Sequence, residues 1–187
     1  MRLVLASASP RRRELLEAAG IQHEVVVSGF DESSVRHLRP LAQARSAARG
    51  KAAEVATRRP DAWVVGCDTV VALDGAALGK PADGVEASRM LRRLAGREHL
   101  VYTAVCLQSP AGERAQGHGV SRVAFADLGS DEIHAYIATG EPMDKAGAYA
   151  IQGKAGDFAA LVSGSTDTVV GLPLHVLHRL GRQLGLW

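Results

Sequence analysis

The segment Trp63–Leu73 constrains the fold of this 187-residue chain more than any other. Its β-branched and apolar residues predict a buried strand, and Asp74-Gly75 is a turn signal into a second short strand over 76–78. Asp68 interrupts this apolar run. An isolated carboxylate in an apolar setting must be paired, metal-bound or protonated, because its desolvation is too costly otherwise. The alternative is a strand-end aspartate that accepts backbone N–H bonds.

The first predicted helix carries an unusual charge at its start. Pro10 fits the first helical position and Ser9 is a good N-cap, yet three arginines follow, beginning with Arg11 and Arg12. The helix dipole disfavours cations there by roughly 0.3–1 kcal/mol each, unless an anion lies nearby. The hydroxyls of Ser7 and Ser9, the two arginines and the backbone N–H groups could together hold a phosphate. The alternative is a basic surface turn with its charges in water.

The rest of the chain alternates predicted strands and helices, the pattern of an α/β protein with antiparallel strands mixed in. Predicted strands cover 3–6, 21–27, 63–73, 76–78, 99–108, 119–125 and 158–162, and predicted helices cover 10–20, 41–57, 84–95, 130–139 and 173–184. We expect a mixed parallel and antiparallel sheet flanked by helices. Residues 1–187 show no internal repeat and no low-complexity linker, so we expect a single domain.

The composition excludes several classes of protein. Hydrophobic residues make up 47% of the chain, but no apolar run approaches the roughly 18 residues of a membrane helix. The net charge of +2 and the aromatic content of 4% do not favour a nucleic-acid partner. Cys67 and Cys106 form no CxxC motif and are expected to be small buried residues. The first residues lack the pattern of a signal peptide, so we expect a cytoplasmic protein.

Further charged residues are candidates for an anion or metal site. Asp31 and Glu32 are adjacent acids, and oxygen ligands of this kind suit magnesium or manganese shared with substrate phosphates. Lys80, between a glycine and a proline, could direct an ammonium at a phosphate. Lys51 in the alanine-rich helix and Lys145 are similar candidates. The alternative for each is a solvated surface charge.

Other familiar motifs are missing. The chain has no P-loop and no GxGxxG fingerprint, and no GxSxG sequence supports a nucleophilic serine. His175 and His178 share a helix face without an acidic third ligand, so we expect them to be surface residues.

Six motifs occur in a family-like order and together span nearly the whole chain. They are Ser7-Ala8-Ser9-Pro10-Arg11-Arg12, Lys51-Ala52, Cys67-Asp68-Thr69-Val70-Val71, Gly79-Lys80-Pro81, the stretch from Asp144 to Gly153, and Val169-Val170-Gly171-Leu172-Pro173-Leu174. This set resembles the Maf family of nucleoside triphosphate pyrophosphatases. Residues 164–168 and the region from Arg36 to Arg49 match the family pattern only loosely.

The resemblance implies a two-lobed α/β fold with a central cleft, of the kind shared by Maf and ITPase proteins, and commonly a homodimer. It implies metal-dependent hydrolysis of a nucleoside triphosphate between its α- and β-phosphates, with magnesium, manganese or cobalt as the divalent cation. The motif around Thr69 and the stretch ending in Gln152-Gly153 are similar to the branch that acts on dTTP and UTP. A 7-methyl-GTP pyrophosphatase and a non-catalytic nucleotide-binding regulator are the alternatives.

The resemblance also implies roles for particular residues. Asp68 matches the proton acceptor, and Arg11, Thr69 and Gln152 match positions tied to the choice of base. The chemistry of a phosphoanhydride, which needs charge neutralisation and an aligned water, gives the remaining candidates. The triphosphate would be held by Ser7, Ser9, Arg11, Arg12, Lys51 and Lys80, and the metal by Glu32 and Asp68. Asp68 is a candidate as base, as metal ligand, or as both.

Overall fold

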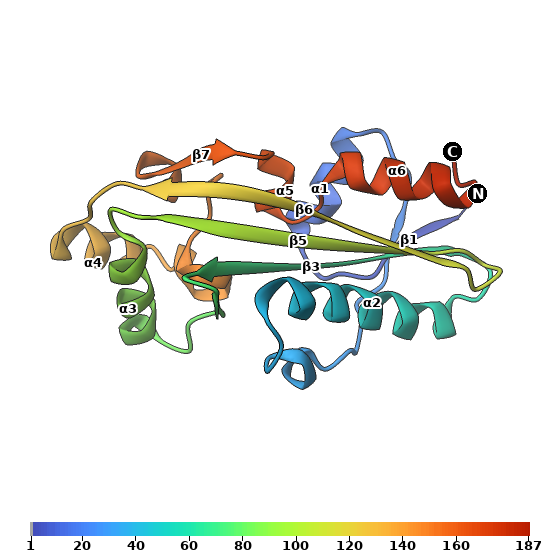
Figure 1. Cartoon of the computed structure of the whole chain (residues 1–187), viewed down its shortest axis with the longest axis horizontal. Helices are drawn as coiled ribbons and strands as arrows, with labels where there is room; N and C mark the ends of the chain where they lie inside the picture. The colour runs from blue at the N-terminus through green and yellow to red at the C-terminus, as the bar shows by residue number, and fades with distance from the viewer. Residues whose placement is uncertain (1) are drawn as a thin grey trace.

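A seven-stranded mixed sheet forms the framework of the computed structural model, which describes residues 2–187 (Figure 1). The strands are β1 (Leu3–Leu5), β2 (Glu24–Val25), β3 (Trp63–Leu73), β4 (Ala76–Leu78), β5 (Glu98–Gln108), β6 (Arg114–Phe125) and β7 (Ala159–Ser163). Their order is β2-β1-β3-β5-β6-β7, and β4 pairs with one end of β3. β1 runs parallel to β2 and β3, whereas the other pairs are antiparallel. The expected mixed sheet is confirmed.

Helices cover the sheet at both ends. They are α1 (Pro10–Ala18), α2 (Pro40–Arg58), α3 (Gly84–Leu94), α4 (Ser130–Ala138), α5 (Thr166–Val170) and α6 (Leu174–Leu184). Short 3₁₀ turns are η1 (Glu32–Val35), η2 (Glu141–Asp144), η3 (Ala146–Ala148) and η4 (Lys154–Asp157). In Figure 1, α2 and α6 enclose one end of the sheet from opposite faces, and α3 and α4 lie at the other end. Within residues 2–187, no helix combines the length and the apolar character that crossing a bilayer requires.

Three apolar clusters follow from the alternation of side chains along the strands. Val64 packs with α2 on one face, and its neighbour Val65 packs with α6 on the other. At the far end of the sheet, Val71 and Phe125 pack with α3 and α4. Because β3 and β5 are each 11 residues long, the same two strands contribute to all three clusters. The two ends of the molecule therefore share one continuous backbone framework.

Gly66 allows α2 to approach β3 unusually closely. A Cβ atom at Gly66 would lie 2.2 Å from the carbonyl oxygen of Ala48 and 2.7 Å from the backbone nitrogen of Ala52. No larger residue fits there unless the helix moves away from the sheet. The close approach places Lys51, on α2, beside Asp68, two residues after Gly66 on β3.

One edge of β3 is open at its centre. β1 pairs with the start of β3, up to Leu5 opposite Val65, and β4 pairs with its end, from Leu78 opposite Val71. Among the residues described, positions 66–70 have β5 on one side and no strand on the other. Side chains from both faces of β3 can therefore border the same opening.

Five details differ from the sequence-based expectations. The strand expected over 21–27 is paired only at Glu24–Val25, and β6 begins at Arg114, not at residue 119, because it pairs with β5 along its whole length. Helix α5 was not expected. Ser9 occupies the N-cap position of α1, but its hydroxyl makes no capping bond. Helix α4 is capped at Gly129, whose N–H donates to Glu132, and not at Ser130.

Candidate active site

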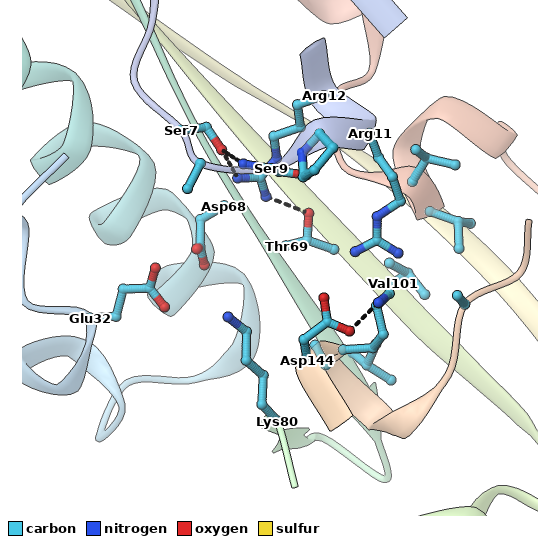
Figure 2. A pocket seen from close by; sticks show the side chains of 18 of the residues that line it. Ser7, Ser9, Arg11, Arg12, Glu32, Asp68, Thr69, Lys80, Val101 and Asp144 are labelled. Atoms are coloured by element: carbon cyan, nitrogen blue, oxygen red, sulfur yellow. Dashed lines mark hydrogen bonds and ion pairs between the residues drawn. The ribbon is translucent and has the colours of Figure 1, made fainter. Parts of the chain in front are cut away.

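A pocket of about 540 Å³ opens at the gap in the edge of β3. All ten residues predicted from the sequence border it: Ser7, Ser9, Arg11, Arg12, Glu32, Lys51, Asp68, Thr69, Lys80 and Gln152. They come from the loop before α1, from α1, η1, α2 and β3, and from the segments after β4 and η3. Figure 2 shows most of these side chains converging on one cavity. The volume suits a ligand the size of a nucleotide.

Arg12 ties three parts of the pocket together. Its Nε donates to the carbonyl oxygen of Gly171 at 2.8 Å. Its Nη1 donates to Ser7 Oγ and its Nη2 to Thr69 Oγ1, each at 3.1 Å (Figure 2). A guanidinium has five N–H donors, so two remain for a ligand. Arg12 is therefore a structural link between α1, β3 and the loop after α5 as well as a candidate phosphate ligand.

The Ser7 hydroxyl is oriented by its neighbours. Its oxygen accepts from the backbone N–H of Ser9 at 3.2 Å and from Arg12 Nη1 at 3.1 Å. These two bonds use both lone pairs, so the hydroxyl proton is left to donate to a ligand. Phosphate oxygens accept hydrogen bonds, so Ser7 is suited to bind one.

Arg11 extends into another part of the pocket. Among residues 2–187 its guanidinium makes no hydrogen bond or ion pair, and Figure 2 shows it pointing toward Val101, away from Glu32. Burial lowers the pKa of Arg11 from its ordinary value. Arginine nevertheless stays charged in proteins, so Arg11 offers a rigid set of donors to a ligand.

The carboxylates of Glu32 and Asp68 meet at the ammonium of Lys51. Lys51 Nζ lies 2.7 Å from Asp68 Oδ1 and 2.6 Å from Glu32 Oε1. Burial raises the pKa of Asp68 despite the nearby ammonium. Burial favours a higher pKa for Glu32, but the hydrogen bond and the positive charge of Lys51 have a larger combined effect. The pKa of Glu32 therefore lies below its usual value. The ammonium of Lys51 compensates the buried charge of Asp68, for which the sequence required a partner.

The same carboxylates have oxygens left to bind a cation. Asp68 Oδ2 and Glu32 Oε2 have no hydrogen-bond partner among the residues described, and Figure 2 shows the two carboxylates facing each other. Residues 2–187 contain no group of three His, Cys, Asp or Glu side chains arranged to hold a metal. Two carboxylates with shared phosphate oxygens and water form a donor set that fits magnesium. The residues present therefore suit a metal that binds together with a phosphorylated ligand.

One charged residue in the pocket, Asp144, was given no site role from sequence alone, whereas its neighbour Lys145 was a candidate phosphate ligand. Asp144 and Lys145 border the pocket and form an ion pair with each other. They begin the glycine-rich stretch that ends in Gly153, and the opposite charge of its neighbour could have drawn attention to Asp144. Gln152, in the same stretch, is exposed and borders the pocket.

The fold and the site define an α/β protein with an anion-binding cleft. Its long mixed sheet has helices on both faces, and the cleft is rich in arginine, lysine and paired carboxylates. The chain belongs to the Maf family, since the model described as "Maf-like protein" matches residues 2–184.

Similar proteins agree with this assignment. A "dTTP/UTP pyrophosphatase" of Myxococcus xanthus is 50% identical over 98% of this chain and 93% of its own length. One of Pelotomaculum thermopropionicum is 47% identical over 98% of this chain and 96% of its own length. A "Nucleoside triphosphate pyrophosphatase" of Salinispora tropica is 44% identical over the whole of this chain and 88% of its own length.

A solved structure supports the fold. The nucleoside-triphosphatase, or dITP/XTP pyrophosphatase, of Mycobacterium abscessus matches 100% of this chain and 94% of its own with a TM-score of 0.50. Its sequence identity of 17% makes this a similarity of fold alone.

Proposed function

We propose that this protein hydrolyses nucleoside triphosphates, dTTP and UTP above all, between the α- and β-phosphates. The products are the nucleoside monophosphate and pyrophosphate. The observation that carries the proposal is the meeting of the arginine turn, Lys80 and the Glu32–Asp68 pair around one pocket of nucleotide size. The names of relatives at 47% and 50% identity support the choice of dTTP and UTP.

The phosphates would be bound by donors that the structure leaves free. Ser7 has its hydroxyl proton available, and Arg12 keeps two N–H groups after its three internal bonds. Lys80 is exposed at the pocket, near enough to Glu32 for its charge to lower the pKa of that carboxyl. Hydrolysis of a phosphoanhydride needs mainly charge neutralisation and alignment, which these groups would supply.

Glu32 and Asp68 would hold a divalent cation through the oxygens that Lys51 does not engage. Magnesium or manganese, or alternatively cobalt, would neutralise charge on the phosphates. Asp68 would also accept the proton of the attacking water. Its carboxylate is kept in place by Lys51, so the acceptor is oriented before the substrate binds.

A nucleotide panel tests the proposal. The purified protein is incubated with magnesium or manganese and dTTP, UTP, CTP, ATP, GTP or 7-methyl-GTP, and pyrophosphate is measured. We expect release from dTTP and UTP. Release from 7-methyl-GTP but not from dTTP or UTP would place the protein in the other branch of the family.

Asp68→Asn separates catalysis from binding. We expect it to lower kcat by about 10²–10⁴-fold, the range for loss of a general base, while nucleotide binding persists. Asp131→Asn, at an exposed aspartate on α4 outside the pocket, is the matched control. If Asp68→Asn hydrolysed dTTP as fast as the parent, the catalytic assignment would be wrong. Absence of turnover in the parent, with nucleotide still bound, would identify a regulator.

We also propose that the protein is cytoplasmic and that, as the family resemblance implies, it forms a homodimer. Light scattering after size-exclusion chromatography tests the oligomeric state. The mass of a monomer would contradict the proposed dimer.

A further inference from the structure

Thr103 lies behind the pocket, directly opposite Thr69 in the pairing of β5 with β3. It is fully buried and does not border the pocket, whereas Thr69 does. Its Oγ1 is 2.6 Å from the carbonyl oxygen of Thr168 and 2.9 Å from Thr69 Oγ1. A buried hydroxyl thus connects a pocket residue to the backbone of α5.

The direction of each proton in this chain follows from the donors and acceptors present. A carbonyl oxygen only accepts, so the single proton of Thr103 is donated to Thr168. The short contact between the two threonine hydroxyls then needs Thr69 as the donor. Thr69 has thereby used its proton, and one of its lone pairs accepts from Arg12 Nη2 at 3.1 Å.

Thr69 can therefore accept one more hydrogen bond but cannot donate one to a ligand. Ser7 has the opposite character, because both of its lone pairs are used and its proton is free. A phosphate oxygen suits Ser7 and does not suit Thr69. Figure 2 agrees with this division, since Thr69 lies between Asp68 and Arg11, on the side of the pocket away from Glu32. A hydrogen-bond donor on the base or sugar suits the free lone pair of Thr69.

We propose that Thr103 is a positioning residue for base selection, which turns the Thr69 hydroxyl into an acceptor for the N3–H of uracil or thymine. Cytosine presents a lone pair at N3, so it would face the lone pair of Thr69 and be disfavoured. The inference rests on the proposed function, because it concerns the pyrimidine of that substrate. It adds a residue outside the pocket to the determinants of specificity.

Binding of UMP and CMP, measured by calorimetry with EDTA present, tests the inference without metal or turnover. We expect the parent to bind UMP about tenfold or more tightly than CMP, the effect of one mismatched hydrogen bond. In Thr103→Val the Thr69 proton is free to turn toward the ligand, so the preference should fall below about threefold, largely through tighter CMP binding. Thr103→Ser keeps the hydroxyl and should keep the preference.

Thr57→Val is the matched control, since that hydroxyl donates to the Glu54 carbonyl on α2, outside the pocket. It should retain the parent preference. If Thr103→Val does not fold, Thr103→Cys takes its place with the same expectation, because sulfur is a weak acceptor.

A folded Thr103→Val protein with the parent's preference would overturn the inference. A loss of the UMP preference in Thr103→Ser would also overturn it. The missing methyl group, and not the hydroxyl, would then explain the change in preference. Failure of the proposed function gives a different result, in which the parent hydrolyses neither UTP nor dTTP in the nucleotide panel.

Discussion

The ammonium of Lys51, in the middle of α2, lies 2.7 Å from Oδ1 of Asp68, in the middle of β3. Both side chains are nearly buried, with 10% and 12% of their side-chain surface exposed. A carboxylate in this position therefore depends on a cation supplied by another element. Glu32 completes the cluster from η1, so three separate segments meet at one charged centre.

Replacing Lys51 by Met should destabilise the protein by about 3 kcal/mol, because removal of one partner leaves a buried charge uncompensated. Urea denaturation at pH 7 measures this. The double variant Lys51→Met/Asp68→Asn should be at least about 1 kcal/mol more stable than the sum of the single effects predicts. Lys154→Met, at an exposed lysine, controls for the loss of a positive charge. Additive effects in the double variant would contradict the pairing.

Gly66→Ala should cost about 3 kcal/mol or more, because the new methyl group would collide with backbone atoms of α2 that cannot rotate away. It should also reduce turnover, since Lys51 moves with the helix away from Asp68. Gly79→Ala is the control for stability, as no atom lies within 4 Å of a Cβ there. Equal unfolding midpoints for the two variants would show that the helix is not held at this distance.

His99 should make the stability depend on pH. It is buried, Nε2 lies 2.8 Å from the Tyr149 hydroxyl, and Nδ1 has no partner among the residues described. Burial lowers its pKa to about 4 from 6.5. The unfolded chain therefore binds a proton that the folded protein excludes, so stability is full above pH 6.5 and falls as the pH drops toward 4.

Comparison of the parent with His99→Gln isolates this effect. Between pH 6.5 and 4.5 the parent should lose about 2 kcal/mol more than the variant, by the conversion of pKa shift to free energy. Chemical denaturation across this range measures the difference. His134→Gln, the same substitution at an exposed histidine, is the matched control. Parallel curves for parent and His99→Gln would show that His99 takes up its proton without unfolding.

Ser9→Ala should change stability by less than about 0.5 kcal/mol, because the Ser9 hydroxyl caps nothing. Asp83→Ala should cost about 1 kcal/mol, because Asp83 accepts from the N–H of Glu86 at the start of α3. Thermal unfolding of both variants provides the comparison. A larger loss of stability in Ser9→Ala than in Asp83→Ala would contradict this, and would show that the Ser9 hydroxyl caps α1.

Much of the fold was predictable from the sequence because its signals are local. Proline starts α2, Asp74-Gly75 turns β3 into β4, and Asp83 with Glu86 begins α3, as expected. The start of β6 was missed because Arg114 joins the sheet through its pairing with Gln108, a contact with another strand. Helix α5 was missed because it is only five residues long.

The sequence also singled out residues that lie close together, since all ten candidate residues border one pocket. The contacts that these residues make with one another could not be predicted. Nothing in the local sequence indicates that Lys51 contacts Asp68, because that contact depends on how closely α2 packs on Gly66. Thr103 gives no signal either, as a buried threonine on a strand is ordinary until its neighbours across the sheet are known.

β3 and β5 each run without a break from the α2–α6 end of the molecule to the α3–α4 end (Figure 1). Because hinges are usually formed by loop or element-terminal residues, the middle of these uninterrupted strands offers no such hinge between the two ends. The walls of the cleft formed by the sheet should therefore keep the same separation with and without a nucleotide. The segment over 141–157 is anchored to the same sheet, since the Tyr149 hydroxyl lies 2.8 Å from Nε2 of His99 on β5 and Ala148 is fully buried.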